Sequence, residues 1–529
     1  MIPSEVLRAD VVVVGGGMSA AWAAIGAARQ GASVIVADKG SMGTSGVTAT
    51  GGPGHWWVPP VPAARAAAVE RQTEKARGLG DPAWMARIIE LTWKHLPEIA
   101  PWYPFGTDGN GGLYIQGVRG PEYMRALRQM VRASGVTILD HHPAVELLTT
   151  MDGAVGGIRG VDLCSERSFE VQAGAIILAT GGCAFRSGLI GSHTQTGDGY
   201  LMAAEAGASL SGMEFSISYS LSPAWASTRT LPFFAARFFD RTGTELEIPP
   251  PDAGHAHLQA LGRAMLAGPV MADLADAPPA LEPVLRRIQP LTVAAFERRG
   301  VDLFRQRFAV TLFGEGTIRG TGGIRIVGDD CSTEVDGLYA VGDAASRELV
   351  AGASSGGGAV NSSWALSSGL IAGGAAAQRT KSKPLRHRLH GAGRAGLHPR
   401  RNPATVNLQA LNRVIADHMH GYDRALWRTR ANLMHSLDCL DGVWSELADH
   451  AQGDGRGLVE LRETAAMAAT ARWCTAAALA RAETRGIAVR ADVPAERSEL
   501  AHRFLASGLD RVQIIPDADS VARKAKAVA

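Results

Sequence analysis

The sequence predicts an α/β fold: a Rossmann-like dinucleotide-binding domain into which a second domain is inserted, followed by a helical C-terminal part. Three observations lead to this class. A glycine-rich turn joins a valine-rich strand to an alanine-rich helix near the N-terminus, two later apolar strands also end in glycines, and apolar residues recur at helical spacing beyond residue 404. The length of 529 residues is sufficient for two or three domains.

The first predicted unit is a strand, a helix and a second strand. Residues 9–14 contain four consecutive valines, a composition typical of a parallel strand that is buried on both faces. An alanine-rich helix is expected over residues 19–30, and the second strand over residues 33–37. This order is the unit from which parallel nucleotide-binding sheets are built.

The turn within this unit predicts a dinucleotide site. Gly15, Gly17 and Ala20 occupy the three small-residue positions of a G-x-G-x-x-G/A turn, which bends tightly and brings backbone N–H groups to a pyrophosphate. Asp38 ends the second strand, where a carboxylate accepts hydrogen bonds from ribose hydroxyls. The pattern alone does not distinguish FAD from NAD.

Composition divides the rest of the chain. Two further strands are expected, over residues 173–180 and 337–341, and each is followed by a glycine-containing turn. Aromatic and proline-rich patches between them indicate an inserted domain, and a later basic segment with many glycines and prolines indicates an exposed linker. The predicted boundaries are 1–206 and 319–378 for the two parts of the nucleotide-binding domain, 207–318 for the insertion, 379–403 for the linker and 404–529 for the helical C-terminal domain.

Charge and cysteine content restrict the partners. The 53 Lys and Arg residues nearly balance the 51 acidic residues, which argues against nucleic acid as a partner and favours a small molecule or a protein. The first residues lack the features of a signal peptide and no apolar run reaches the roughly 18 residues of a membrane helix, so we expect a cytoplasmic protein without a membrane span. Five dispersed cysteines match no metal or iron–sulfur spacing, so any iron–sulfur centre must come from another chain.

Several segments together resemble the succinate dehydrogenase/fumarate reductase flavoprotein family, which also includes L-aspartate oxidase and the adenylylsulfate reductase α subunit. They are VVVVGGGMSAAWAA, SHTQTGDGYLMAAEAGA, GTGGIRI with GLYAVGDAA, and RETAAMAATARWCTAAALARAETRG, and they follow the family's order. The resemblance implies a Rossmann-like FAD-binding domain with an inserted α+β capping domain and a C-terminal helical domain.

The same resemblance implies FAD as the cofactor. The residues expected to contact it are Gly15, Gly17, Met18, Ser19, Ala20, Asp38, Lys39, Ser45, Gly46, Gly51, Gly52, Val145, Ala179, Thr180, Gly181, Asp198, Gly342, Asp343, Gly358 and Asn361.

The sequence departs from the family at its reactive positions. Members that bind FAD covalently use a His in the segment that here runs from Thr44 to Thr48 and contains neither His nor Cys, so we expect non-covalent FAD. The substrate-binding His and Arg of the dicarboxylate enzymes, and the capping-domain Arg that protonates the substrate, are also missing from their expected segments. Succinate and fumarate are therefore not expected to be the substrates.

Four residues are candidates for a part in catalysis. Arg319 stands close to the position of the missing substrate His, and either holds a carboxylate, sulfonate or carbonyl oxygen or forms a structural ion pair. His55 either transfers a proton or packs in the core, and Tyr219 either replaces the missing acid or makes local hydrogen bonds. Arg347 either acts at the flavin edge or pairs with Glu348.

These observations predict an FAD-dependent oxidoreductase (a reductase or a dehydrogenase) that acts on a small anionic or carbonyl-containing molecule. The alternative is a flavin electron-transfer subunit that resembles adenylylsulfate reductase α and works with a separate iron–sulfur partner. Other electron-transfer partners, and a homo-oligomer, are compatible with the sequence. No metal site is predicted.

Overall fold

A computed structural model describes residues 5–107, 112–115, 117–228, 231–383 and 388–520. Its central element is an eight-stranded sheet in the order β16-β6-β7-β8-β1-β2-β5, with β15 also paired to β8. The strands β1, β2, β5, β8 and β15 pair in parallel, whereas β6, β7 and β16 add antiparallel pairs at one side. The strands are β1 (Glu5–Val14), β2 (Val34–Ala37), β5 (Thr137–Leu139), β6 (Ala144–Thr149), β7 (Val155–Val161), β8 (Ser168–Leu178), β15 (Leu338–Ala340) and β16 (His390–Gly391).

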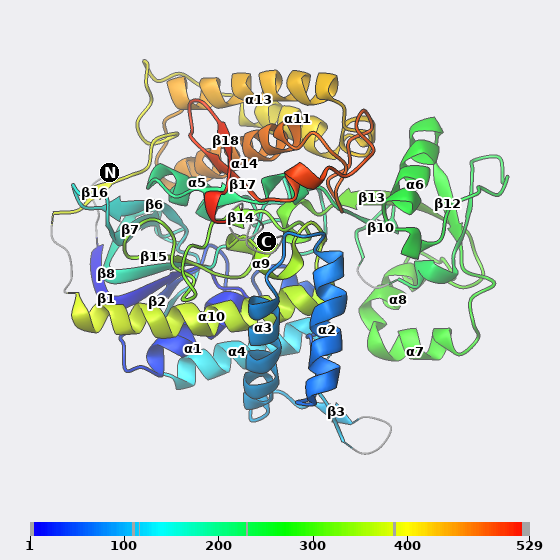
Figure 1. Ribbon diagram of the computed structural model, residues 1–529, viewed down its shortest axis with the longest axis horizontal. Coiled ribbons are helices and arrows are strands. Elements are labelled where there is room, and N and C mark those ends of the chain that lie inside the picture. Colours follow the sequence, from blue (N-terminus) through cyan, green and yellow to red (C-terminus); the bar gives the residue numbers. More distant parts are fainter. Residues whose placement is uncertain (1–4, 108–111, 116, 229–230, 384–387, 521–529) are drawn as a thin grey trace.

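Helices cover both faces of this sheet (Figure 1). On one side α1 (Met18–Ala28) packs closely on α10 (Gly357–Ser382), because Gly369 and Gly373 of α10 meet the backbone of α1 where a β-carbon would clash. α4 (Gly120–Ala133) and α3 (Pro82–His95) extend this layer. The predicted strand, helix and strand of the first unit are confirmed as β1, α1 and β2.

The inserted segment forms a lobe beside the main body (right in Figure 1). Its four-stranded antiparallel sheet has the order β10-β13-β12-β11, and its apolar side chains form a hydrophobic cluster separate from the main core. The chain enters and leaves the lobe through β10 and β13, which pair with each other. The elements are β10 (Tyr219–Pro223), β11 (Arg237–Phe239), α6 (His255–Ala267), β12 (Val270–Asp273), α7 (Leu281–Ile288), α8 (Pro290–Glu297) and β13 (Phe308–Gly314).

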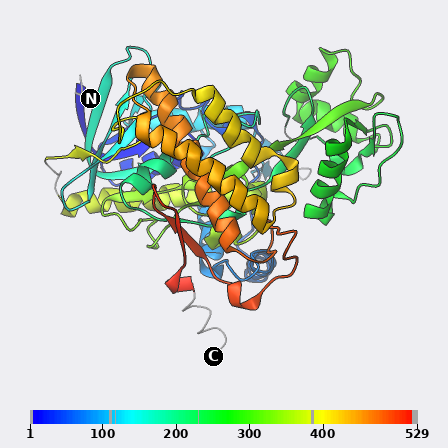
Figure 2. The same cartoon turned by 90° about the horizontal axis from the view of Figure 1, so that it is seen from above.

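The long helices of the C-terminal part end at residue 480. The long helices α13 and α14 cross the other face of the main body (Figure 2), and the chain then returns as two strands. Of these, β17 pairs with β9, so the C-terminal segment joins a small sheet of order β14-β9-β17-β18 instead of extending the bundle as predicted. The elements are α11 (Leu408–His420), α12 (Tyr422–Ala425), α13 (Arg430–His450), α14 (Gly455–Ala480), β9 (Leu210–Ser211), β14 (Gly323–Ile324), β17 (Phe504–Ser507) and β18 (Gln513–Pro516).

The remaining helices and strands are short or peripheral. They are α2 (Pro62–Lys75), β3 (Gly106–Thr107), β4 (Leu113–Tyr114), α5 (Asp198–Glu205) and α9 (Glu348–Ala351). Across the described residues, no helix combines the length and the apolar character needed to cross a bilayer.

Candidate functional site

A long cleft opens where β1, β2 and β8 end and where α1 and α10 begin. About 1390 Å³ of space lies in this cleft when the solvent at its open mouth is included. Ligands of parallel α/β sheets bind at this edge, outside the carboxyl ends of the strands. Of the residues predicted to contact a cofactor, those that line the cleft are Gly15, Gly17, Met18, Ser19, Asp38, Lys39, Ser45, Gly46, Gly51, Gly52, Ala179, Thr180, Gly181, Asp198, Asp343, Gly358 and Asn361.

Two helix N-termini face the cleft without a side-chain cap. The residues before α1 and α10 are Gly17 and Gly356, which supply no side chain to the free backbone N–H groups. A β-carbon added at Gly17 or at Gly358 would meet no protein atom within 4 Å, so the backbone is bare at both points. Free N–H groups and the positive end of the helix dipole favour an anionic group such as a phosphate.

Gly15 makes the tight turn that points α1 at the cleft. Its φ of 116° lies in a region that side chains rarely adopt, and a β-carbon there would clash with the carbonyl oxygen of Ala179. Glycine is therefore needed at position 15 for the backbone turn to form. At position 17 the protein itself would leave room for a side chain.

Unpartnered polar atoms along the cleft fit a polar ligand. The Thr180 hydroxyl and the Asn361 side-chain oxygen line the cleft, and both atoms are buried without a hydrogen-bond partner. Buried polar atoms rarely remain unpaired because each costs about 1–3 kcal/mol of lost solvation. The cleft therefore offers hydrogen bonds that no protein group uses.

Asp38 lies at the wall of the cleft, next to the glycine turn. Its carboxylate accepts a hydrogen bond from Ser45 Oγ at 2.5 Å, and burial raises its pKa. The side chain is 5% exposed and borders the cleft, where a ribose hydroxyl could donate a hydrogen bond to it.

Lys39 is already paired within the protein. Its Nζ lies 2.7 Å from both Asp198 and Glu463 and donates to Thr196 Oγ1 at 2.8 Å. Burial alone would lower the pKa of the ammonium, but the two carboxylates raise it. Although Lys39 lines the cleft, its charge is neutralised, so we assign the anion-binding role to the helix N-termini instead.

Three predicted contact residues do not line the cleft. Ala20 is fully buried within α1, Gly342 packs on Ser19, and Val145 borders a small adjoining cavity. Lining residues that the prediction missed include Thr48, Gln195 and Ile318. Gln195 stands in the SHTQTGDG segment, and its side-chain oxygen accepts a hydrogen bond from the Gly182 backbone at 3.0 Å. Gln195 could have been predicted, because it is a polar residue within a segment that resembles the flavoprotein family.

Among the four candidates for catalysis, Arg319 lines the cleft. Its Nε lies 3.0 Å from Glu315 Oε2, and the Glu315 side chain is buried while that of Arg319 is 35% exposed. The sequence left open whether Arg319 binds a ligand or forms a structural ion pair. In the structure Arg319 forms an ion pair with Glu315 and also lines the cleft. The buried carboxylate of Glu315 neutralises part of the charge of Arg319 on the protein side.

The structure places the other three candidates elsewhere. His55 is buried against Tyr123, neither ring nitrogen has a partner, and burial lowers its pKa to about 3. The Tyr219 hydroxyl donates to the carbonyl of His420 at 3.1 Å, and burial raises its pKa. None of these three candidates lines the cleft, so we assign no part in catalysis to His55, Tyr219 or Arg347.

Arg347 is a structural residue. Its side chain is fully buried, and it donates to the carboxylate of Asp343 and to the carbonyl oxygens of Thr317, Ile318 and Gly320. It therefore does not pair with Glu348, as one sequence alternative had it, but holds the turn that leads to Arg319.

Glu348 is buried at the start of α9, away from the cleft. Ser211 Oγ donates to one carboxylate oxygen, and the other is buried without a partner. Burial, reinforced by the nearby Glu214, raises the pKa of Glu348 to about 7 from its usual 4.5. The folded protein thus favours the neutral acid, while the unfolded chain ionises near pH 4.5.

This pKa shift predicts a pH-dependent stability. As the pH rises from 5 to 8, folding must place a buried charge at Glu348, so the free energy of unfolding should fall. The Glu348→Gln variant should lose part of that pH dependence and should melt higher than the parent at pH 8 but not at pH 5. Thermal melts at several pH values measure this, with Glu74→Gln on an exposed helix surface as the control. Parallel curves for parent and Glu348→Gln would contradict it.

The sequence is similar to those of known flavoproteins. The family model described as "FAD dependent oxidoreductase" matches residues 10–187, which contain the strands and turns of the cleft. An L-aspartate oxidase of Mycobacterium bovis is 28% identical and covers 95% of this chain and 96% of its own. A match to the L-aspartate oxidase of Streptomyces coelicolor is 27% identical and covers 40% of each protein.

Solved structures share the fold over nearly the whole chain. Mycobacterium smegmatis Sdh1 superposes with a TM-score of 0.79 at 21% identity, covering 97% of this chain and 94% of that one. The adenylylsulfate reductase of Archaeoglobus fulgidus gives 0.77 at 17%, covering 97% and 96%. The fold expected from the resemblance is confirmed, including the lobe and the C-terminal helices.

Proposed function

We propose that the chain is an FAD-dependent oxidoreductase that oxidises or reduces a small anionic or carbonyl-containing molecule bound by Arg319. The observation that carries this proposal is that Arg319 is a cation at the wall of the same cleft that presents the two helix N-termini. A permanently charged guanidinium with several donors is suited to a carboxylate, a sulfonate or a carbonyl oxygen.

The residues of the cleft fit FAD. The N-termini of α1 and α10 would face its phosphates, the Asp38 carboxylate would accept hydrogen bonds from its ribose, and Thr180 and Asn361 would pair their free oxygens with it. We propose that FAD is held without a covalent bond, because Ser45, Gly46, Val47 and Thr48 line this part of the cleft and offer no imidazole or thiol. When bound, FAD supplies two-electron hydride chemistry.

Within this arrangement the protein's part is to bind and orient the substrate. The carboxylate of Glu315 forms an ion pair with the guanidinium of Arg319, and the guanidinium carries N–H donors on all three of its nitrogens. A substrate oxygen that gains negative charge during the reaction would accept hydrogen bonds from these donors.

The flavin spectrum tests this proposal. We expect that, without oxygen, at least one small anion bleaches the oxidised flavin band of the FAD-loaded protein, or restores it in the reduced protein. The panel includes L-aspartate, because L-aspartate oxidases are relatives, together with succinate, fumarate, sulfonates, enones and aromatic acids. Neutral amides of the reactive acids are the matched controls. If no compound changes the redox state of the flavin, the proposed substrate class is wrong.

An electron-transfer subunit remains the second prediction from the sequence. All five cysteines are free and dispersed, so an iron–sulfur cluster in that function would have to belong to another protein. A brown complex with cluster absorbance, isolated from the native source, would favour this alternative over the first.

A further inference from the structure

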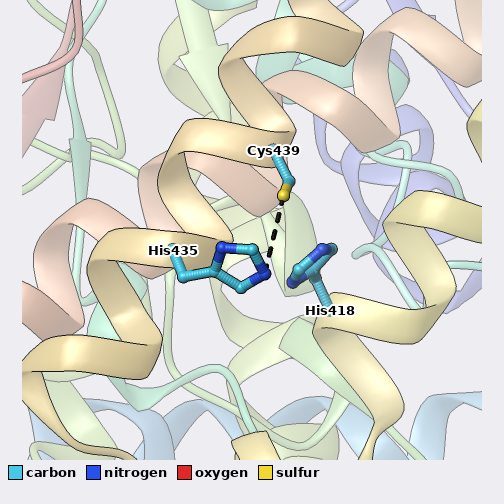
Figure 3. Close-up of side chains that lie close together, drawn as sticks. All are labelled: His418, His435 and Cys439. Carbon is cyan, nitrogen blue, oxygen red and sulfur yellow. Dashed lines mark hydrogen bonds between the residues drawn. The ribbon is translucent and has the colours of Figure 1, made fainter.

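Three metal-binding side chains meet between α11 and α13, outside the cleft (Figure 3). His418 comes from the last turn of α11, and His435 and Cys439 come from α13. One ligand atom of each residue lies within 4.8 Å of the other two, and the His435 Nε2 to Cys439 Sγ distance is 3.9 Å. His435 and Cys439 are four residues apart, so both lie on one face of α13.

The distance between His435 and Cys439 is close to that around a bound zinc ion. With bonds of about 2.0 Å to nitrogen and 2.3 Å to sulfur, a tetrahedral zinc separates a nitrogen ligand from a sulfur ligand by about 3.5 Å. The 3.9 Å between His435 and Cys439 therefore needs only a small rotamer adjustment. From this arrangement we infer that His418, His435 and Cys439 form a binding site for a zinc-class divalent metal, with water as the fourth ligand.

A neighbouring serine orients one of the ligands. Ser436 lies on α13 between the two ligand positions, and its Oγ is 2.9 Å from Nδ1 of His418. Such an outer hydrogen bond fixes the ring orientation of a metal-binding histidine. A neutral imidazole is the form that binds a metal.

The ligand set and its exposure favour zinc over hard cations. Two imidazoles and one thiolate are ligands for zinc or copper, whereas magnesium and calcium prefer oxygen. His435 is exposed, and His418 and Cys439 are partly exposed, so an ion and its water can reach all three from solvent. Such a site is open at the fourth position, unlike the closed four-ligand sites that support folds.

A metal at this position would fasten α11 to α13 close to the lobe. Beyond His418, the carbonyl of His420 accepts from Tyr219 of the lobe strand β10. The Tyr422 hydroxyl, in α12, lies 3.0 Å from Thr311 Oγ1 of β13 and accepts from the Leu312 backbone at 3.2 Å. The end of α11 and the adjoining α12 thus form hydrogen bonds with β10 and β13, the two strands that lead into and out of the lobe.

The test uses the full-length, FAD-loaded protein after removal of metals with a chelator. On titration with Co²⁺ we expect one equivalent to bind, with intense visible bands typical of tetrahedral cobalt and a near-ultraviolet band from the thiolate. Excess Zn²⁺ should abolish these bands and raise the melting temperature. Cys439→Ser should lose the thiolate band, and His418→Ala and His435→Ala should weaken Zn²⁺ binding by more than about 100-fold, the upper range for loss of an outer-shell group.

Two variants make the result specific. Ser436→Ala should weaken Zn²⁺ binding about 10- to 100-fold and leave the thiolate band in place. Cys164→Ser, which removes an exposed cysteine of another loop, should bind cobalt as the parent does. Without metal, FAD content and melting temperature of Cys439→Ser should match the parent. Failure of the parent to bind cobalt, or a thiolate band that survives in Cys439→Ser, would overturn the inference.

Discussion

Replacing Gly17 by Val is expected to weaken FAD binding about 10- to 100-fold, because three added carbon atoms would occupy the point where a phosphate must reach the backbone. Overpacking of this kind costs about 1–3 kcal/mol, and 1.4 kcal/mol corresponds to a factor of ten in affinity. No protein atom lies within 4 Å of a β-carbon at Gly17, so the apoprotein should still fold. FAD released from purified protein by acid, relative to protein concentration, measures the loss.

The matched control is Gly442→Val on α13, another glycine whose β-carbon would meet no protein atom within 4 Å. Gly442→Val should keep full FAD content, since only its position relative to the cleft differs. If Gly17→Val also keeps full FAD content, the cofactor does not pass this turn and the assignment of the cleft is wrong. A Gly17→Val protein that unfolds without FAD, as seen by circular dichroism, would show that the glycine serves the fold.

Arg319→Ala is expected to lower kcat/KM about 30- to 1,000-fold, equivalent to about 2–4 kcal/mol, for the compound that reacts with the flavin. This is the range for removing one donor that stabilises developing charge in a transition state. The FAD content should stay at the parent's level, because the helix N-termini and Asp38 remain. Steady-state kinetics and flavin absorbance measure the two quantities on the same preparation.

Arg319→Lys should recover only part of the lost rate, because an ammonium cannot reproduce the paired donors of a guanidinium. Arg237→Ala is the control, since Arg237 forms its ion pairs with Glu245 and Asp276 on the surface of the lobe. It should react at the parent's rate. Normal turnover by Arg319→Ala, or loss of FAD and of the folded state, would mean that the Glu315 ion pair is structural and the substrate donor lies elsewhere.

Local patterns made the nucleotide-binding half of the fold predictable. The expected strand over residues 9–14 extends in the structure from Glu5 to Val14, and the helix expected over 19–30 runs from Met18 to Ala28. Both follow from residues close in sequence: valines for a strand buried on two faces, and alanines for a helix that must approach another backbone. The position of the cleft could also be predicted, because these strands end at one edge of the sheet, where ligands of parallel sheets bind.

Contacts between distant segments could not be predicted in this way. The pairing of β17 with β9 joins residues about 300 positions apart, and a strand of four residues does not specify its partner. Arg347 gave the same sequence signal as Arg319, yet three backbone carbonyls and Asp343 surround it in the core. The His418, His435 and Cys439 cluster escaped notice because its spacing fits no metal motif and only the packing of α11 on α13 brings the third ligand close.

The two chain crossings into the lobe lie side by side, and this has a mechanical consequence. β10 pairs with β13, and β9 with β14, while α6 of the lobe also packs against α12, where Gln259 donates to the carbonyl of Leu426 at 2.8 Å. The strand β17 pairs with β9 on the main-body side of the paired strands. The lobe is therefore held both at the paired strands and at α12, and β17 reinforces the first of these two attachments.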